Sequence, residues 1–111
     1  MLELTIERDR IAKLRDEAWA EGRTSAQNAS IFEKLYKMEY SKRLAEEEKN
    51  GVYSKSNLSK ILDGEEEIAS AYQKFKQADA DAKFQFKKVD MYQRDLKYID
   101  EEIERQWHSN Q

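Results

Sequence analysis

Residues 65–106, EEEIASAYQKFKQADADAKFQFKKVDMYQRDLKYIDEEIERQ, decide the fold that the sequence predicts. One set of positions recurs in this stretch at alternating steps of three and four residues, and neither glycine nor proline interrupts it. The positions are Ile68, Tyr72, Phe75, Asp79, Ala82, Phe86, Val89, Gln93, Leu96, Asp100, Ile103 and Trp107. This period is that of one face of an α-helix, so we expect a single long amphipathic helix over about residues 65–107.

The composition of the 111-residue chain favours long solvated helices over a thick globular core. Hydrophobic residues make up 39% of it and charged residues another 39%, while proline is absent and glycine occurs at positions 22, 51 and 64 only. Cysteine is absent too, which excludes a disulfide framework and a cysteine-ligated zinc site. We therefore predict an all-α protein with a single helical domain over residues 1–111.

A first helical arm is predicted over about residues 3–49. Its apolar stripe consists of Leu4, Ile11, Leu14, Ala18, Ile31, Leu35, Met38 and Ala45, with Phe32, Tyr36, Tyr40 and Leu44 beside it. Gly22 weakens this helix by about 1 kcal/mol relative to alanine, and Thr24 with Gln27 has the spacing of a capping box. The arm therefore either continues through residues 22–25, with or without a kink, or turns there.

The segment between the two arms contains a short helix and two turn signals. Asn50-Gly51 is expected to close the first arm, because glycine readily adopts the left-handed conformation. Ser56 can cap a short helix over about residues 57–62, and Asp63-Gly64 then precedes the long helix. If the arms fold back here, position i faces roughly position 114 minus i. The predicted fold is a long antiparallel helical hairpin, a coiled coil, with a short helix in the bend.

A hairpin of two helices leaves much of each apolar stripe exposed to water. Pairing of two hairpins, or folding of the first arm at Gly22, would cover the stripes in a multi-helix bundle. We favour the first solution and expect a homo-oligomer. Asp79 and Asp100 are then expected at a wet edge of the seam or bound to a cation.

Phe84, Met91 and Tyr98 form a second stripe, because they recur every seven residues on the face of the long helix away from the seam. A solvated helix face does not normally carry three such side chains. The stripe either packs against a second copy or the short helix, or docks a helix of another protein. The second interpretation makes these three residues the candidate partner-binding site of an adaptor or inhibitor protein.

Basic residues near this stripe support an alternative function. Residues 74–97 contain seven basic and four acidic side chains. Lys83, Lys87, Lys88 and Arg94 alternate there with aromatic residues, as in proteins that bind single-stranded nucleic acid. Lysine stems that merely cover apolar surface give the same pattern. The alternative is an accessory single-stranded nucleic-acid-binding protein.

The sequence contains no pattern that indicates catalysis, so we predict no catalytic residue, cofactor or metal and no enzyme activity. His108 is the only histidine, and with Glu104 it supplies two ligands where a zinc site needs more. No run approaches the roughly 20 apolar residues of a membrane-spanning helix, and the start of the chain lacks a signal-peptide core. The predicted location is the cytoplasm, with no membrane partner.

The order of features resembles small helical-hairpin proteins of unassigned function that are encoded in the early regions of bacteriophages. The resemblance is carried by the bend at Glu48-Lys49-Asn50-Gly51, by Leu62-Asp63-Gly64-Glu65-Glu66, and by Tyr92-Gln93-Arg94-Asp95-Leu96 through Glu104-Arg105-Gln106. It implies a phage product that acts in the host cytoplasm on DNA metabolism or on a host protein. It supplies no catalytic residues.

Overall fold

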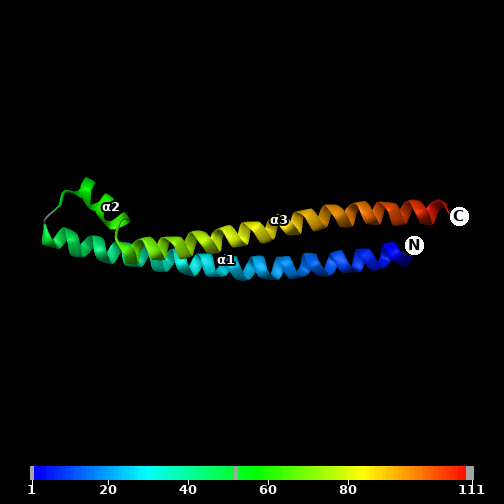
Figure 1. Cartoon of the computed structure of the whole chain (residues 1–111), viewed down its shortest axis with the longest axis horizontal. Coiled ribbons are helices and arrows are strands. Elements are labelled where there is room, and N and C mark those ends of the chain that lie inside the picture. Colours follow the sequence, from blue (N-terminus) through cyan, green and yellow to red (C-terminus); the bar gives the residue numbers. More distant parts are fainter. Residues whose placement is uncertain (1, 52, 110–111) are drawn as a thin grey trace. The chain divides into compact units, whose positions relative to one another are not determined.

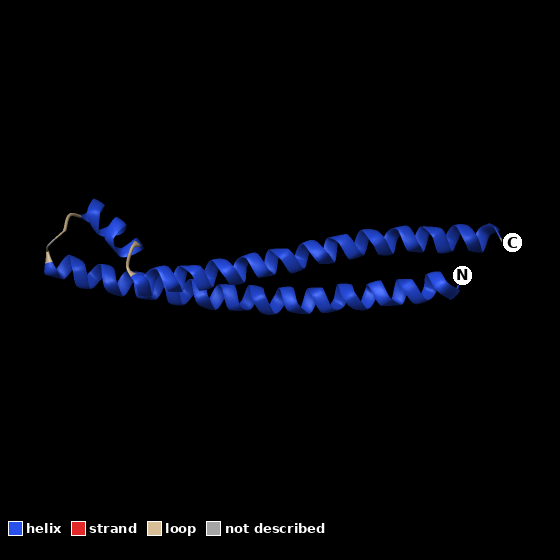
Figure 2. Cartoon of the chain, viewed as in Figure 1, coloured by secondary structure: helices blue, strands red, loops and turns tan. Residues whose placement is uncertain are grey.

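The computed structural model describes residues 2–51 and 53–109, with the backbone alone at residues 55 and 56. These residues form three helices and no strand: α1 (Leu2–Asn50), α2 (Lys55–Asp63) and α3 (Glu66–Ser109) (Figures 1 and 2). The contacts divide the chain into a first unit, Met1–Thr24 with Ala82–Gln111, and a second unit, Ser25–Asp81. In each unit α1 and α3 lie side by side and run in opposite directions. The predicted all-α antiparallel hairpin with a short helix in the bend is confirmed.

The first unit has a narrow core along one line of contact between α1 and α3. Ile11 and Ala18 of α1 and Val89 and Leu96 of α3 are buried there. All four occupy predicted stripe positions. Burying one valine, leucine or isoleucine side chain contributes about 1.5–3 kcal/mol, so this strip is the main source of cohesion in the unit.

Gly22 lies in this core, where α1 and α3 approach each other closely. A Cβ atom added to Gly22 would lie 2.7 Å from Cε1 of Phe86. The Phe86 ring also packs against Trp19, with ring centroids 5.4 Å apart. Because α1 continues through Gly22, the alternative of a turn at residues 22–25 is wrong. The glycine makes room for an aromatic ring and does not end the helix.

In the second unit α2 closes the core at the bend. Leu58 and Leu62 of α2, together with Ile68 of α3, are the largest fully buried side chains of the described residues. The hydroxyl of Tyr40 on α1 donates a hydrogen bond to Oγ of Ser59 on α2, at 3.3 Å. Helix α2 therefore contacts α1 near Tyr40 and lies over the start of α3 at Ile68.

The end of α1 follows the predicted signal, whereas the start of α2 differs from the prediction. Gly51 adopts φ +70° and donates its N–H to the carbonyl of Glu47, as expected for the end of α1. The predicted cap of the short helix, Ser56, is wrong, because α2 begins earlier, at Lys55. Ser54 is the N-cap, and its carbonyl accepts the N–H of Leu58 at 2.9 Å.

A cluster of ion pairs joins α1 to the start of α3 in the second unit. The Arg43 guanidinium donates to both carboxylate oxygens of Glu65, at 2.8 and 2.9 Å, and to Glu46 at 2.8 Å. These hydrogen bonds hold the pKa of Glu65 below its ordinary value and raise the pKa of Arg43. Such bidentate contacts fix geometry as well as charge, so the pair helps to set the position of α3 along α1.

The register of the hairpin differs from the predicted one. Contacting pairs are Arg8–Asp100 and Gly22–Phe86 in the first unit, and Tyr36–Tyr72 and Arg43–Glu65 in the second. In every pair the two residue numbers add up to 108, not to about 114. The prediction was wrong because it placed Lys49 opposite Glu65. Glu65 instead faces Arg43, and α1 continues past Arg43 to Asn50.

The seam of α3 differs from the prediction at alternate positions. Ile68, Phe75, Ala82, Val89, Leu96 and Ile103 are buried or half-buried, as predicted. Between them Ala71, Ala78, Gln85, Tyr92, Ile99 and Gln106 also face inward, each one residue before a predicted position, while the predicted Phe86 is half-buried with its ring next to Gly22 of α1. Asp79 is half-buried, while Gln93 and Asp100 are exposed. Asp100 pairs with Arg8 at the wet edge of the seam, in line with one of the two environments expected for it.

Replacing Gly22 with leucine should destabilise the protein, because the new side chain would need the space of the Phe86 ring. We expect the free energy of unfolding, measured by urea denaturation, to fall by about 2 kcal/mol. The matched control is Ala20→Leu at an exposed position of α1, which should change that free energy by less than about 0.5 kcal/mol. Equal effects of the two substitutions would contradict the close approach at Gly22.

Replacing Glu65 with glutamine should weaken the dependence of stability on acid pH. The pKa of Glu65 in the folded protein lies below its ordinary value of 4.5. The carboxylate therefore contributes stability above the unfolded-state pKa, and this contribution is lost as pH falls through the lower folded-state pKa. Thermal melts between about pH 3 and pH 7 should show a smaller loss of Tm in Glu65→Gln than in the wild type.

The control for this measurement is Glu67→Gln, since Glu67 is exposed and makes no ion pair with another described residue. This variant should keep the acid dependence of the wild type. A Glu65→Gln profile that runs parallel to the wild-type profile would show that the Arg43–Glu65 pair does not stabilise the folded state.

Candidate functional site

Phe84, Met91 and Tyr98 lie in a row on the outer side of α3, in the first unit. Their side chains are exposed by 58%, 42% and 66%. Ala82 and Val89, which are buried, precede the first two by two residues, or about 200° around the helix. The row, which we call the α3 row, therefore faces away from α1. All three side chains are exposed, because no other side chain in the described part of the chain buries them.

Basic side chains flank the α3 row unevenly. Lys87 and Arg94 follow Phe84 and Met91 by three residues, so both lie on the same flank. Both are exposed, and neither makes an ion pair with another described residue. The third residue of that flank, after Tyr98, is Glu101, and the opposite flank, four residues after each row member, carries Lys88, Asp95 and Glu102. One flank of the row therefore has two cations beside Phe84 and Met91, and the other flank is mainly acidic.

The four basic residues of the nucleic-acid alternative are not equally available. Nζ of Lys88 lies 4.9 Å from the centroid of the Phe84 ring, a cation–π distance. Lys83 already interacts with another group of the chain. Lys87 and Arg94 are thus the cations best placed to meet an anionic group from another molecule.

The structure corrects the stripe predicted on α1 between residues 31 and 45. Ile31, Leu35 and Met38 were predicted in the hairpin seam, but they are exposed by 56%, 53% and 58%. The half-buried apolar residues are instead the four predicted beside the stripe: Phe32, Tyr36, Tyr40 and Leu44. The Tyr36 ring packs on the Tyr72 ring, with centroids 5.2 Å apart. Aromatic side chains, which bury more area, face α3 and leave an aliphatic face outside.

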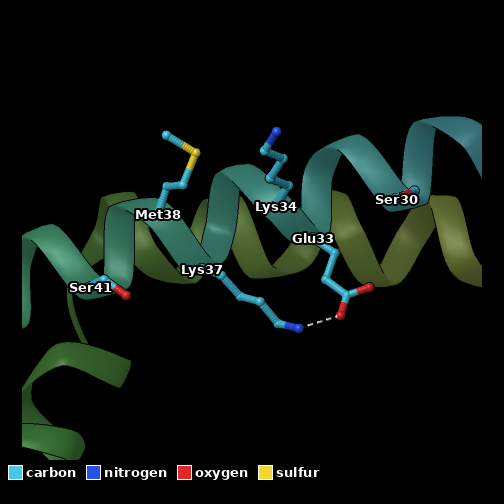
Figure 3. Close-up of a pocket in the computed structure, with 6 residues that line it drawn as sticks. All are labelled: Ser30, Glu33, Lys34, Lys37, Met38 and Ser41. Atoms are coloured by element: carbon cyan, nitrogen blue, oxygen red, sulfur yellow. Dashed lines mark ion pairs between the residues drawn. The ribbon is translucent and has the colours of Figure 1, made fainter.

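Two shallow surface hollows adjoin this aliphatic face of the second unit. The first has a volume of about 550 Å³ and is bordered by Ser30, Glu33, Lys34, Lys37, Met38 and Ser41 of α1 (Figure 3). The second, of about 560 Å³, lies between Phe32 and Leu35 of α1 and Ala71 and Lys74 of α3. Both are open to solvent and suit a macromolecular contact better than an enclosed small ligand.

The described residues assemble neither a metal site nor a membrane span. They include no group of three or more histidine, cysteine, aspartate or glutamate side chains that could hold a metal ion. His108 pairs with Glu104 at 3.7 Å, and both side chains are exposed. None of the described helices combines the length and the apolar character needed to cross a bilayer.

Comparison of the chain with protein-family models, curated proteins and solved structures found no match. The α3 row offers three large apolar contacts at the spacing of a helix, with cations along one flank. This combination suits the apolar face of another helix that carries acidic side chains on one side.

Proposed function

We propose that the protein is a non-enzymatic interaction protein, an adaptor or inhibitor, that binds a helix of another protein on the α3 row. The exposure of Phe84, Met91 and Tyr98 on one face carries this proposal. Large aromatic and methionine side chains are enriched at the centres of protein interfaces, where a few anchors contribute most of the affinity. A helix that covers the row would remove all three from water.

The charges beside the row define the chemistry of the partner. Lys87 and Arg94 favour acidic side chains on the facing flank of the partner helix. The apolar residues of that helix should recur at about seven-residue intervals, so that they match the row. The proposed partner segment is thus an amphipathic, acidic helix.

The resemblance to bacteriophage early-region proteins supports a partner that belongs to DNA metabolism, of the phage or of its host. In that setting the protein would act in the host cytoplasm by occupying a helical surface of its target. This part of the proposal rests on the order of sequence features alone.

Substituting glutamate in the α3 row should abolish partner capture. We expect Phe84→Glu and Tyr98→Glu each to reduce capture of the partner from a lysate of the source cells by at least about tenfold. Helicity measured by circular dichroism should be unchanged, because both side chains are exposed. Leu35→Glu, at an equally exposed apolar position of the second unit, is the matched control and should capture normally. Undiminished capture by both row variants would contradict the proposal.

A single-stranded nucleic acid is the second candidate partner. It is favoured by the exposed aromatic rings of Phe84 and Tyr98 with Lys87 and Arg94 beside them, since bases stack on aromatic rings while phosphates meet cations. The prior engagement of Lys83 and the acidic Asp95 on the other flank favour a protein helix instead.

Binding to a fluorescently labelled oligothymidylate separates the two candidates. On the protein-partner proposal we expect no specific affinity in fluorescence anisotropy at about 20 mM salt. The nucleic-acid candidate requires binding that weakens steeply at about 200 mM salt, because phosphate contacts release counterions. It also requires that Lys87→Glu/Arg94→Glu lose this binding, while Lys37→Glu, a basic residue of the second unit, retains it.

A further inference from the structure

We propose that α1 carries a self-association face in the second unit, by which two copies of the chain pair their α1 helices in parallel. The face consists of Asn28, Ile31, Leu35, Met38, Lys42 and Ala45, all of them exposed. Their spacing alternates three and four residues, the repeat of a coiled-coil seam. The face is independent of the α3 row, whose three residues belong to the first unit.

This face is a second seam of α1: Ile31 and Met38 lie on the side away from α3, and Leu35 borders the groove between the two helices. Ala29, which is buried, and Tyr36, which packs on Tyr72, precede Ile31 and Met38 by two residues each. A step of two residues is about 200° around a helix, so Ile31 and Met38 point away from α3. Each α1 helix can therefore hold α3 on one face and another helix on the adjacent face.

The flanking charges identify the occupant as a second copy. Lys34 precedes Leu35, and Glu39 follows Met38, which places them at the g and e positions of the seam. In a parallel pair the g residue of one helix meets the e residue of the next heptad on the other helix, so Lys34 of each copy meets Glu39 of its partner. The face is thus complementary to itself.

Both charges are available for this contact. Neither Lys34 nor Glu39 makes an ion pair with another described residue. The nearby Glu33 instead pairs with Lys37 within α1, at 2.8 Å. Figure 3 shows Lys34 and Met38 projecting from one side of α1, while Glu33 and Lys37 meet on the other side.

Asn28 favours the parallel orientation over the antiparallel one. It occupies an a position of the seam, as do Leu35 and Lys42. In a parallel pair Asn28 faces its own copy, and the two amides can donate to and accept from each other. A single polar residue at such a position sets the register and favours two strands. In an antiparallel pair Asn28 would face Ala45, and its amide would lose this partner.

The same seam limits the affinity. Lys42 faces its own copy and has to extend its ammonium group into water, so the apolar core consists of the three layers at Ile31, Leu35 and Met38. Such a contact is smaller than a standard interface of about 800 Å² per partner. The dimer is therefore expected to dissociate on dilution.

The association is tested by sedimentation equilibrium of the full chain over a range of concentrations. We expect a monomer–dimer equilibrium whose dissociation constant rises at least about tenfold in Leu35→Glu. Phe84→Glu, an equally exposed apolar position of the first unit, is the control and should dimerise like the wild type. A wild-type chain that stays monomeric up to about 200 µM, well above the micromolar range, would overturn the proposal, as would a Leu35→Glu variant that dimerises normally.

Charge exchange tests the predicted g–e contact. Lys34→Glu should weaken the dimer, because it places two glutamates against each other. The double variant Lys34→Glu/Glu39→Lys restores opposite charges and should dimerise more tightly than Lys34→Glu. A double variant no tighter than the single one would overturn the parallel register.

Disulfide cross-linking tests the orientation cleanly, since the chain has no cysteine of its own. In a parallel pair the two copies of residue 45 face each other, and Ala45→Cys should form a disulfide-linked dimer, because a disulfide needs Cα atoms about 4.4–6.8 Å apart. An antiparallel pair would separate them by about 25 Å. Ala80→Cys, at an exposed position of α3, is the matched control and should remain monomeric under oxidation. Cross-linking of Ala80→Cys as efficient as that of Ala45→Cys, or none for Ala45→Cys at concentrations that give dimer, would overturn the proposal.

Discussion

In both units α1 and α3 contact each other along only one narrow strip of each helix, and this small contact area constrains the whole structure. Among the described residues ten hydrophobic side chains are buried, and four of them are alanines, Ala18, Ala29, Ala78 and Ala82; the buried Gly22 lies between the first two along α1. Small side chains let two helices approach closely, but each contributes little apolar area. The larger apolar side chains therefore cannot all reach the strip. Several of them, including Leu35 and Phe84, remain on the outer faces.

The bend compensates for the thin core in the second unit. A nine-residue helix such as α2 would not be stable by itself in water, since helices of this length are marginal without tertiary contacts. Its Leu58 and Leu62 are fully buried together with Ile68 at the start of α3. The Arg43–Glu65 pair lies next to this cluster along the chain and adds a directional contact to a non-directional one. The second unit thus combines the best-buried side chains with a specific ion pair.

The sequence pattern predicted the helices well and their contacts less well. The apolar period fixed the helical arms, and the Asn50-Gly51 signal fixed the end of α1. A heptad pattern does not say whether the step of three or the step of four comes first, so Asp79 and Gln93 were assigned to a seam that holds Ala78 and Tyr92. The register depends on how far residues 51–65 fold back along α1 before α3 begins, which places Glu65 opposite Arg43 and which local signals do not encode.

Two features of the candidate surfaces also escaped the pattern. Between residues 31 and 45 both faces of α1 are apolar, so periodicity could not tell which face contacts α3. The signal that could have done so is the aromatic content of the face with Tyr36 and Tyr40, which faces inward. Gly22 resembled a helix breaker because its partner, the Phe86 ring, is distant in sequence. Such a glycine is recognised only when the opposite helix is in place.

The charges beside the two exposed faces differ, and this difference supports a separate proposed role for each. On α1 the flanks carry Lys34 and Glu39, which complement each other when two copies run in parallel. On α3 one flank carries Lys87 and Arg94, which have the same sign. In an antiparallel pair the same flanks meet, so a second copy on the α3 row would bring basic groups together at a cost in free energy. The α3 row therefore suits an acidic helix of another protein, and self-pairing through α1 would leave that row free to bind it.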